Sequence, residues 1–147
     1  MKVLLQRVIR ASVSVDGKAI AEIGRGLVAL VGIARGDSDK DAQYLAKKII
    51  ELRIFPDEGG KFNLSIMDVR GELLVVSQFT LLADVSRGRR PSFFDAAPPA
   101  QAESLFQQFV HLLQASRLRV RTGRFGQHML VKIYNDGPVT ILLDSKV

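Results

Sequence analysis

The sequence predicts a single-domain α+β fold, in which mixed, mostly antiparallel β-sheets approach a barrel and two main helices pack on one side. Three observations carry this prediction. A block of strand-like runs opens the chain, two stretches with helical apolar spacing follow at separate places, and further strand-like runs lie between and after them. This order favours helices gathered on one side of a sheet over alternating βαβ units. The 147 residues fit one domain, 1–147.

Three antiparallel strands are predicted at the start of the chain. Residues 8–15 alternate between apolar and serine side chains over their second half, as in a half-buried strand. Asp16-Gly17 is a strong hairpin signal, and residues 18–23 form the returning strand. The continuous apolar run 27–33 predicts a central strand that is buried on both faces.

Two amphipathic helices are predicted. Asp37, Ser38 and Asp39 are capping residues for the first helix, and Pro98-Pro99 precede the second. The apolar positions with helical spacing are Ala42, Leu45, Ala46, Ile49 and Leu52 in the first helix and Ala102, Leu105, Phe106, Phe109, Val110 and Leu113 in the second.

The remaining strands are predicted from shorter runs. Residues 72–76 form a strand that leads into the segment 77–81, and residues 117–121 form one with a basic face. Two strands, 129–134 and 139–143, end the chain. Between these elements, residues 83–99 form a loop long enough to indicate function or disorder.

Composition narrows the class of protein. Lys and Arg number 21 against 15 for Asp and Glu, which gives a net charge of +6 and favours polyanionic partners. There is no cysteine, which excludes disulfides and thiolate metal sites. No apolar run approaches about 20 residues, and Gln6 and Arg7 interrupt any signal-peptide core. We therefore expect a cytoplasmic protein without a membrane segment.

Residues 135–140 allow two interpretations. Asn135-Asp136-Gly137-Pro138 is ordinary turn chemistry, and on these residues alone a hairpin turn is favoured. Alternatively, proline fixes φ, glycine permits unusual backbone angles, and an X-Pro bond can be cis. Such a segment would hold two carbonyl groups rigidly in one direction, which suits a site that selects its ligand by shape.

Recognisable catalytic machinery is missing. His111 and His128 are isolated, and no metal-binding spacing or nucleophile elbow occurs, so we expect no metal and no cofactor. What remains is Ser77-Gln78-Phe79-Thr80 at the end of an apolar run. These residues either satisfy the backbone of a turn or display functional groups. Thr80 as a nucleophile would need a base within about 3 Å, and the sequence offers none nearby.

Taken together, Ser77-Gln78-Phe79-Thr80-Leu81 and Asn135-Asp136-Gly137-Pro138-Val139-Thr140 resemble the two signature motifs of the D-aminoacyl-tRNA deacylases, SQFTL and NxGPVT. Both match in full. The resemblance extends over the whole chain and includes Gly88-Arg89-Arg90-Pro91-Ser92-Phe93. The residues Ser77-Gln78-Phe79-Thr80 favour the D-specific branch over a paralogous tRNA deacylase that differs at the first motif.

The resemblance implies hydrolysis of the ester that joins a D-amino acid to the 3′ ribose of tRNA. It also implies a homodimer in which Gly137-Pro138, in cis, enters the partner's pocket beside Ser77, Gln78, Phe79 and Thr80. Main-chain N–H groups of Phe79 and Thr80 would then bind the oxyanion. If the Gly137 and Pro138 carbonyls bind the α-amino group, L side chains would collide with this rigid backbone segment. Glycyl-tRNA, which has no side chain to collide, would remain a possible substrate.

For tRNA binding, the basic cluster Arg87, Arg89 and Arg90 is the first candidate for phosphate contacts, and Lys47, Lys48 and Arg121 are further ones. Two alternatives stay open. One is a non-catalytic RNA-binding module, although aromatic residues make up only 7% of the chain. The other is a small hydrolase that uses a threonine nucleophile on free D-amino acid esters.

Overall fold

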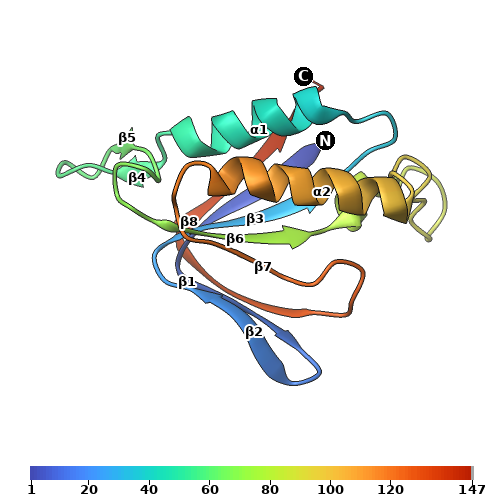
Figure 1. Ribbon diagram of the computed structural model, residues 1–147, viewed down its shortest axis with the longest axis horizontal. Helices are drawn as coiled ribbons and strands as arrows, with labels where there is room; N and C mark the ends of the chain where they lie inside the picture. Colours follow the sequence, from blue (N-terminus) through green and yellow to red (C-terminus); the bar gives the residue numbers. More distant parts are fainter. Residues whose placement is uncertain (147) are drawn as a thin grey trace.

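A six-stranded sheet forms the centre of the computed structural model, which describes residues 1–146 (Figure 1). The sheet order is β2-β1-β3-β6-β7, and β8 pairs with the other side of β1. A separate two-stranded sheet joins β4 and β5. The strands are β1 (Lys2–Val15), β2 (Lys18–Ile23), β3 (Gly26–Gly32), β4 (Phe55–Pro56), β5 (Phe62–Leu64), β6 (Glu72–Ser77), β7 (Val120–Thr122) and β8 (Leu130–Asp144).

The sheet is mixed, as the sequence predicts. β1 pairs antiparallel with β2, β3 and β8, whereas β3–β6 and β6–β7 are parallel. The first half of β1 pairs with β3 and its second half with β2, so the long strand bridges two parts of the sheet. The sheet curls until β2 and β6 share one apolar cluster, which brings it close to a barrel.

Both helices cover the same side of this sheet (Figure 1). α1 (Asp39–Glu51) begins after the N-cap Ser38, and α2 (Pro99–Gln114) begins at the second of the paired prolines. The buried positions of α1 include Leu45 and Ile49, and those of α2 include Phe109 and Leu113. The predicted apolar stripes therefore face the sheet, and the fold class predicted from the sequence is confirmed.

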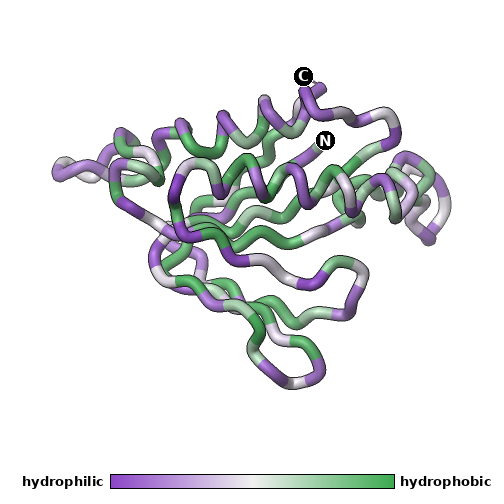
Figure 2. The backbone as a smooth tube through the Cα atoms, viewed as in Figure 1, coloured by the Kyte–Doolittle hydropathy of each residue, from purple (hydrophilic) through white to green (hydrophobic). Residues whose placement is uncertain are grey.

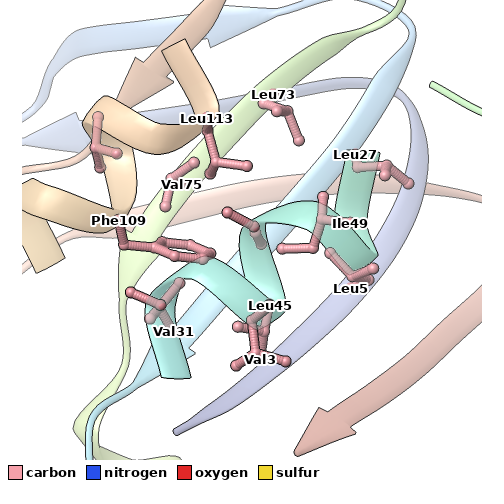
Figure 3. Packing of buried hydrophobic residues seen from close by; sticks show 14 of the residues in the cluster. Val3, Leu5, Leu27, Val31, Leu45, Ile49, Leu73, Val75, Phe109 and Leu113 are labelled. Carbon is pink, nitrogen blue, oxygen red and sulfur yellow. The ribbon is translucent and has the colours of Figure 1, made fainter. Parts of the chain in front are cut away.

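Two apolar layers hold the sheet in place. Val31 of β3 and Val75 of β6 point to the helices and meet Phe109 and Leu45 in the larger cluster (Figure 3). Val28 lies in the smaller cluster inside the curl. The central strand is thus buried on both faces, as its unbroken apolar run predicts. The hydropathy colouring shows the same division, with apolar residues along the strands and polar residues in the outer loops (Figure 2).

Some element boundaries differ from the prediction. β1 begins at Lys2 rather than at residue 8, because alternate residues such as Val3 and Leu5 also face the core. β7 contains only the last part of the predicted basic strand, since Arg117 takes a positive φ and ends the turn after α2. Among the described residues, no helix is both long and apolar enough to span a bilayer.

A polar cluster joins α1 to the end of β8. The Asp41 carboxylate accepts hydrogen bonds from the Ser38 main-chain N–H (2.8 Å) and from the Ser145 hydroxyl (2.6 Å), and Lys146 Nζ lies 2.9 Å away. Burial alone would raise the pKa of Asp41, but these hydrogen bonds and the Lys146 charge together bring it well below its usual range. The folded protein therefore stabilises the ionised form of Asp41 over the protonated form.

Asp41→Asn should lower the free energy of unfolding by about 2 kcal/mol at pH 7, because it weakens hydrogen bonds to a charged group. The folded pKa lies below the unfolded value of about 3.9. The stabilisation is therefore complete above about pH 4 and is lost as the pH falls towards the folded pKa. Urea unfolding of both proteins between pH 7 and pH 2.5 should show the two curves converging in acid. Asp39→Asn is the matched control, with an effect of a few tenths of a kcal/mol; an equal effect of both changes would contradict the prediction.

Candidate active site

The first polar motif lies where the sheet ends. In the parallel ladder Ser77, the last residue of β6, is opposite Val31 of β3, and the Gln78 N–H donates to the Val31 carbonyl at 2.7 Å. The chain then leaves the sheet in a 3₁₀ turn, η1 (Phe79–Leu82). The strand predicted over residues 72–76 therefore ends one residue later, and the motif lies at its end, as the sequence predicts. Because the 3₁₀ turn tightens the chain, the motif turns sharply at the strand end.

The turn leaves polar groups available at its start. The Leu81 N–H bonds to the Gln78 carbonyl, so Phe79 and Thr80 occupy the first two positions, where a 3₁₀ turn supplies no acceptor of its own. The Gln78 side-chain amide donates to the Thr80 hydroxyl. The Thr80 side chain is thereby engaged by its neighbour, and the main-chain N–H groups of the turn are the groups left to bind a negative oxygen.

A cavity of about 700 Å³ opens beside this turn. Ser77, Gln78 and Phe79 line it, whereas Thr80 does not. The Phe79 ring is 55% exposed and meets the Phe93 ring edge-on, with 4.9 Å between centroids and 68° between planes. The cavity is large enough for an amino acid and part of a nucleoside. Three members of the predicted catalytic set thus share one concave surface.

Other walls of the cavity come from segments that the sequence analysis did not connect. They belong to the end of β3, the segment 93–99 and the segment before β8. Phe125 and His128, which no sequence motif marks as site residues, both line the cavity. No local pattern predicts these contributions, because each depends on how distant strands pair.

The second motif lies in a bulge of β8. Thr140 pairs with Gln6 and Asn135 pairs with Val8, so four residues of β8 stand opposite the single residue Arg7. Both flanking runs pair with β1 and not with each other. The hairpin turn favoured by the residues alone is therefore wrong.

The bulge is held by side chains on either side. The Asn135 carboxamide oxygen accepts from the Val139 N–H (3.0 Å), and its Nδ2 donates to the Thr140 hydroxyl (2.9 Å). Buried Arg7 donates to the Asp136 carbonyl at 3.2 Å and to the Ile54 carbonyl at 2.8 Å. The Gly137-Pro138 peptide bond is cis. Gly137 has a φ of +132°, a region essentially closed to other residues.

Within one chain the two motifs do not meet. Gly137 and Pro138 are exposed and are not among the residues that line the cavity. Large exposed apolar side chains lie on β8, which carries the bulge, and on its partner β1. They are Ile9 on β1 and Leu130, Tyr134 and Leu142 on β8. Large apolar side chains that stay exposed are candidates for contact with another protein.

The basic cluster lies in a closed loop. Asp84 and Ser92 exchange two main-chain hydrogen bonds of 2.8 Å, which close the loop, and Arg87, Arg89 and Arg90 are exposed between them. Hydrogen bonds from Ser86 lower the pKa of Asp84. The loop is the polar segment at the right of Figure 2, and the residues that follow it line the cavity.

Of the three further basic candidates, two have partners within α1 and the third lies on β7. Lys47 lies 3.9 Å from Glu51, and Lys48 lies over the Tyr44 ring at 5.6 Å. Arg121 is half-buried in β7. Among residues 1–146, no group of three or more histidine or acidic side chains is arranged to hold a metal ion.

Comparison with known proteins gives consistent matches. A family model described as "D-Tyr-tRNA(Tyr) deacylase" matches residues 4–144. A D-aminoacyl-tRNA deacylase of Dehalococcoides mccartyi is 57% identical over 146 residues, which are 99% of this chain and 95% of that protein. A D-aminoacyl-tRNA deacylase of Thermosipho africanus is 53% identical over 146 residues, 99% of this chain and 98% of the relative.

Two solved structures share the fold of this chain. The structure titled "c-Myc DNA Unwinding Element Binding Protein" aligns over 98% of both chains with a TM-score of 0.92 and 45% identity. A probable eukaryotic D-amino acid tRNA deacylase aligns over 97% of both chains with a TM-score of 0.84. At 18% identity this second likeness concerns the fold alone.

Proposed function

The chain belongs to the D-Tyr-tRNA(Tyr) deacylase family, and from this premise we propose that it is a hydrolase that cleaves the ester bond of D-aminoacyl-tRNA. The observation that carries the proposal is identity above 50% with D-aminoacyl-tRNA deacylases over 99% of the chain. The reaction releases the free D-amino acid and tRNA, and so removes D residues before translation uses them. Because tRNA is used in translation, we propose that the enzyme acts in the cytoplasm.

The chemistry needs little from side chains, because an aminoacyl ester is already activated. Water attacks the carbonyl carbon, the bond to the ribose oxygen breaks, and that oxygen leaves as a hydroxyl of tRNA. The neighbouring ribose hydroxyl of the substrate can help to activate the water. We assign the N–H groups of Phe79, on the cavity wall, and of Thr80, next to it at the start of the turn, to the developing oxyanion, with Ser77 and Gln78 shaping the surrounding wall.

Thr80→Ala should retain much of the deacylase rate, within about tenfold of the parent. The hydroxyl is engaged by the Gln78 amide and lies outside the cavity lining, and alanine keeps the main-chain N–H. Single-turnover hydrolysis of D-Tyr-tRNA measures the rate. Total loss of activity with intact folding and tRNA binding would instead favour a threonine nucleophile.

We further propose a homodimer in which each cavity is completed by Gly137 and Pro138 of the partner subunit. The exposure of this bulge supports it, as do the exposed apolar side chains on β1 and β8. The bulge is pinned by Arg7 and Asn135, so its carbonyls form a rigid wall. Such a wall would reject L side chains by collision and would not distinguish glycine, which has no side chain to reject.

For the tRNA backbone we propose phosphate contacts from Arg87, Arg89 and Arg90. Arg89→Ala should weaken tRNA binding and reduce the slope of log affinity against log salt by about 0.7–0.9. Filter binding between 50 and 300 mM salt measures the slope. Lys47→Ala is the comparison, because Lys47 already faces Glu51 and should change the slope less; an unchanged slope for Arg89→Ala would remove the loop from the interface.

The function is tested by incubating pure protein with D-Tyr-tRNA, L-Tyr-tRNA, glycyl-tRNA and the free ester of D-tyrosine. We expect turnover of the D form, some turnover of the glycyl form and little of the L form. If none of these substrates is turned over, the result would favour the alternative that the protein is a non-catalytic RNA-binding module. Equal turnover of the free ester and D-Tyr-tRNA would favour the small hydrolase of free esters, and equal turnover of L and D forms would remove the account of chirality.

A further inference from the structure

An exposed aromatic ring lies beside the mouth of the cavity. Phe94 is 74% exposed, while the residue before it, Phe93, lines the cavity and contacts Phe79. Leaving so large an apolar side chain in water forgoes the stabilisation that burial would give. Phe94 therefore stands where a flat partner could cover it.

The ring is held in place by the segment that follows β3. The Arg35 guanidinium lies 5.1 Å from the Phe94 ring centroid, and its Nε–H donates to the Phe94 carbonyl. The main chain adds a bond of 2.9 Å from the Arg35 N–H to the Asp95 carbonyl. Another of 2.9 Å runs from the Ala97 N–H to the Ile33 carbonyl. The ring and the cation thus form one preorganised surface and not a mobile loop tip.

This surface connects the cavity to the basic loop. Arg35 itself lines the cavity, and Arg87, Arg89 and Arg90 lie in the loop that leads into Phe94. A single-stranded nucleic acid that places its last nucleotide in the cavity would leave past Arg35 and then meet the arginines. Unpaired bases stack on aromatic rings and on guanidinium planes, and their phosphates pair with arginine.

We propose that Phe94 and Arg35 form a stacking platform for the unpaired nucleotide that precedes the esterified 3′ nucleotide of tRNA. The proposal rests on the proposed deacylase function and adds a binding subsite outside the cavity. It explains why an apolar ring stays exposed next to a cation in a pinned segment. It assigns Phe94 to base contact, distinct from the phosphate contacts of the loop.

The test compares Phe94→Ala with the parent on three D-tyrosyl substrates: the 3′ ester of adenosine, the ester of the trinucleotide that ends tRNA, and full D-Tyr-tRNA. We expect kcat/KM to fall about tenfold on the trinucleotide and on tRNA, as for the loss of one base stack. It should not change on the adenosine ester. Phe94→Trp should retain the parent values. Val85→Ala is the matched control, since Val85 is 73% exposed in the neighbouring basic loop but offers no ring.

Each other outcome overturns the proposal. An equal fall on all three substrates would mean that Phe94 acts on the cavity, and no fall on any would mean that it contacts no nucleotide. A fall on tRNA alone would place the ring against the paired stem. Parent protein that hydrolyses none of the three esters would instead refute the proposed function, which keeps the two failures apart.

Discussion

Heterodimers that combine Ala96→Trp in one subunit with Gly137→Ala in the other should recover deacylase activity that both homodimeric variants lack. Ala96 lines the cavity and is half-buried, so an indole there would occupy the space of the substrate. At Gly137 a Cβ would lie 2.8 Å from Val139 Cγ2 and 3.1 Å from the Val139 nitrogen, at a φ of +132°. The bulge must then change shape, although the exposed position leaves the core intact.

The expected recovery follows from two-fold symmetry. If each site combines a cavity from one subunit with a bulge from the other, the mixed dimer has one intact site and one doubly damaged site. Its rate should be about half that of the parent dimer. If both motifs act within one chain, every site carries one defect and no activity returns. Co-expression with two affinity tags isolates the mixed dimer for the assay.

A reciprocal mixture is the matched control. Parent chain paired with a chain that carries both substitutions should be inactive, because each site then receives one damaged part from the doubly substituted chain. A site built within one chain predicts the opposite, about half of the parent rate. The two mixtures contain the same substitutions, so differences in expression or stability cannot produce the reversal. Recovery in the reciprocal mixture alone would contradict the cross-subunit site.

Predictions from the sequence hold where a residue pattern reports directly on burial. The run 27–33 has apolar side chains on both sides, and β3 contributes Leu27, Ala29 and Val31 to one layer and Val28 to the other. The helical stripes likewise identify the faces of α1 and α2 that meet the sheet. Periodicity measures how many sides of an element are covered, so these parts of the fold could be predicted.

The bulge of β8 could not be predicted from its local residues. Asn-Asp-Gly-Pro is equally good chemistry for a hairpin turn and for a bulge, and the difference is whether the flanking strands pair with each other or with β1. That choice depends on Arg7, almost 130 residues earlier in the chain, whose side chain bonds to Asp136. The cavity wall behaves in the same way, because Arg35, Phe93 and His128 converge only once the sheet has formed.

Gly26→Ala should lower the free energy of unfolding by about 3 kcal/mol or more, because the backbone on both sides is fixed. Gly26 begins β3 and pairs in parallel with Glu72 of β6, at the ladder that ends at the cavity. A Cβ at Gly26 would lie 1.8 Å from the Glu72 carbonyl oxygen and 2.6 Å from its nitrogen. Relief would require β3 and β6 to separate, which opens both apolar layers at once.

Gly24→Ala is the matched control for this prediction. Its Cβ would meet only the Glu72 Oε1 side-chain atom, at 3.2 Å, and that carboxylate can shift by a few tenths of an ångström. Urea unfolding should therefore place Gly24→Ala within about 1 kcal/mol of the parent and Gly26→Ala far below it. Because Ser77 stands at the other end of the same ladder, Gly26→Ala should also reduce deacylase activity in the folded fraction. Equal stability of the two variants would mean that β3 and β6 can move apart without disturbing the layers between them.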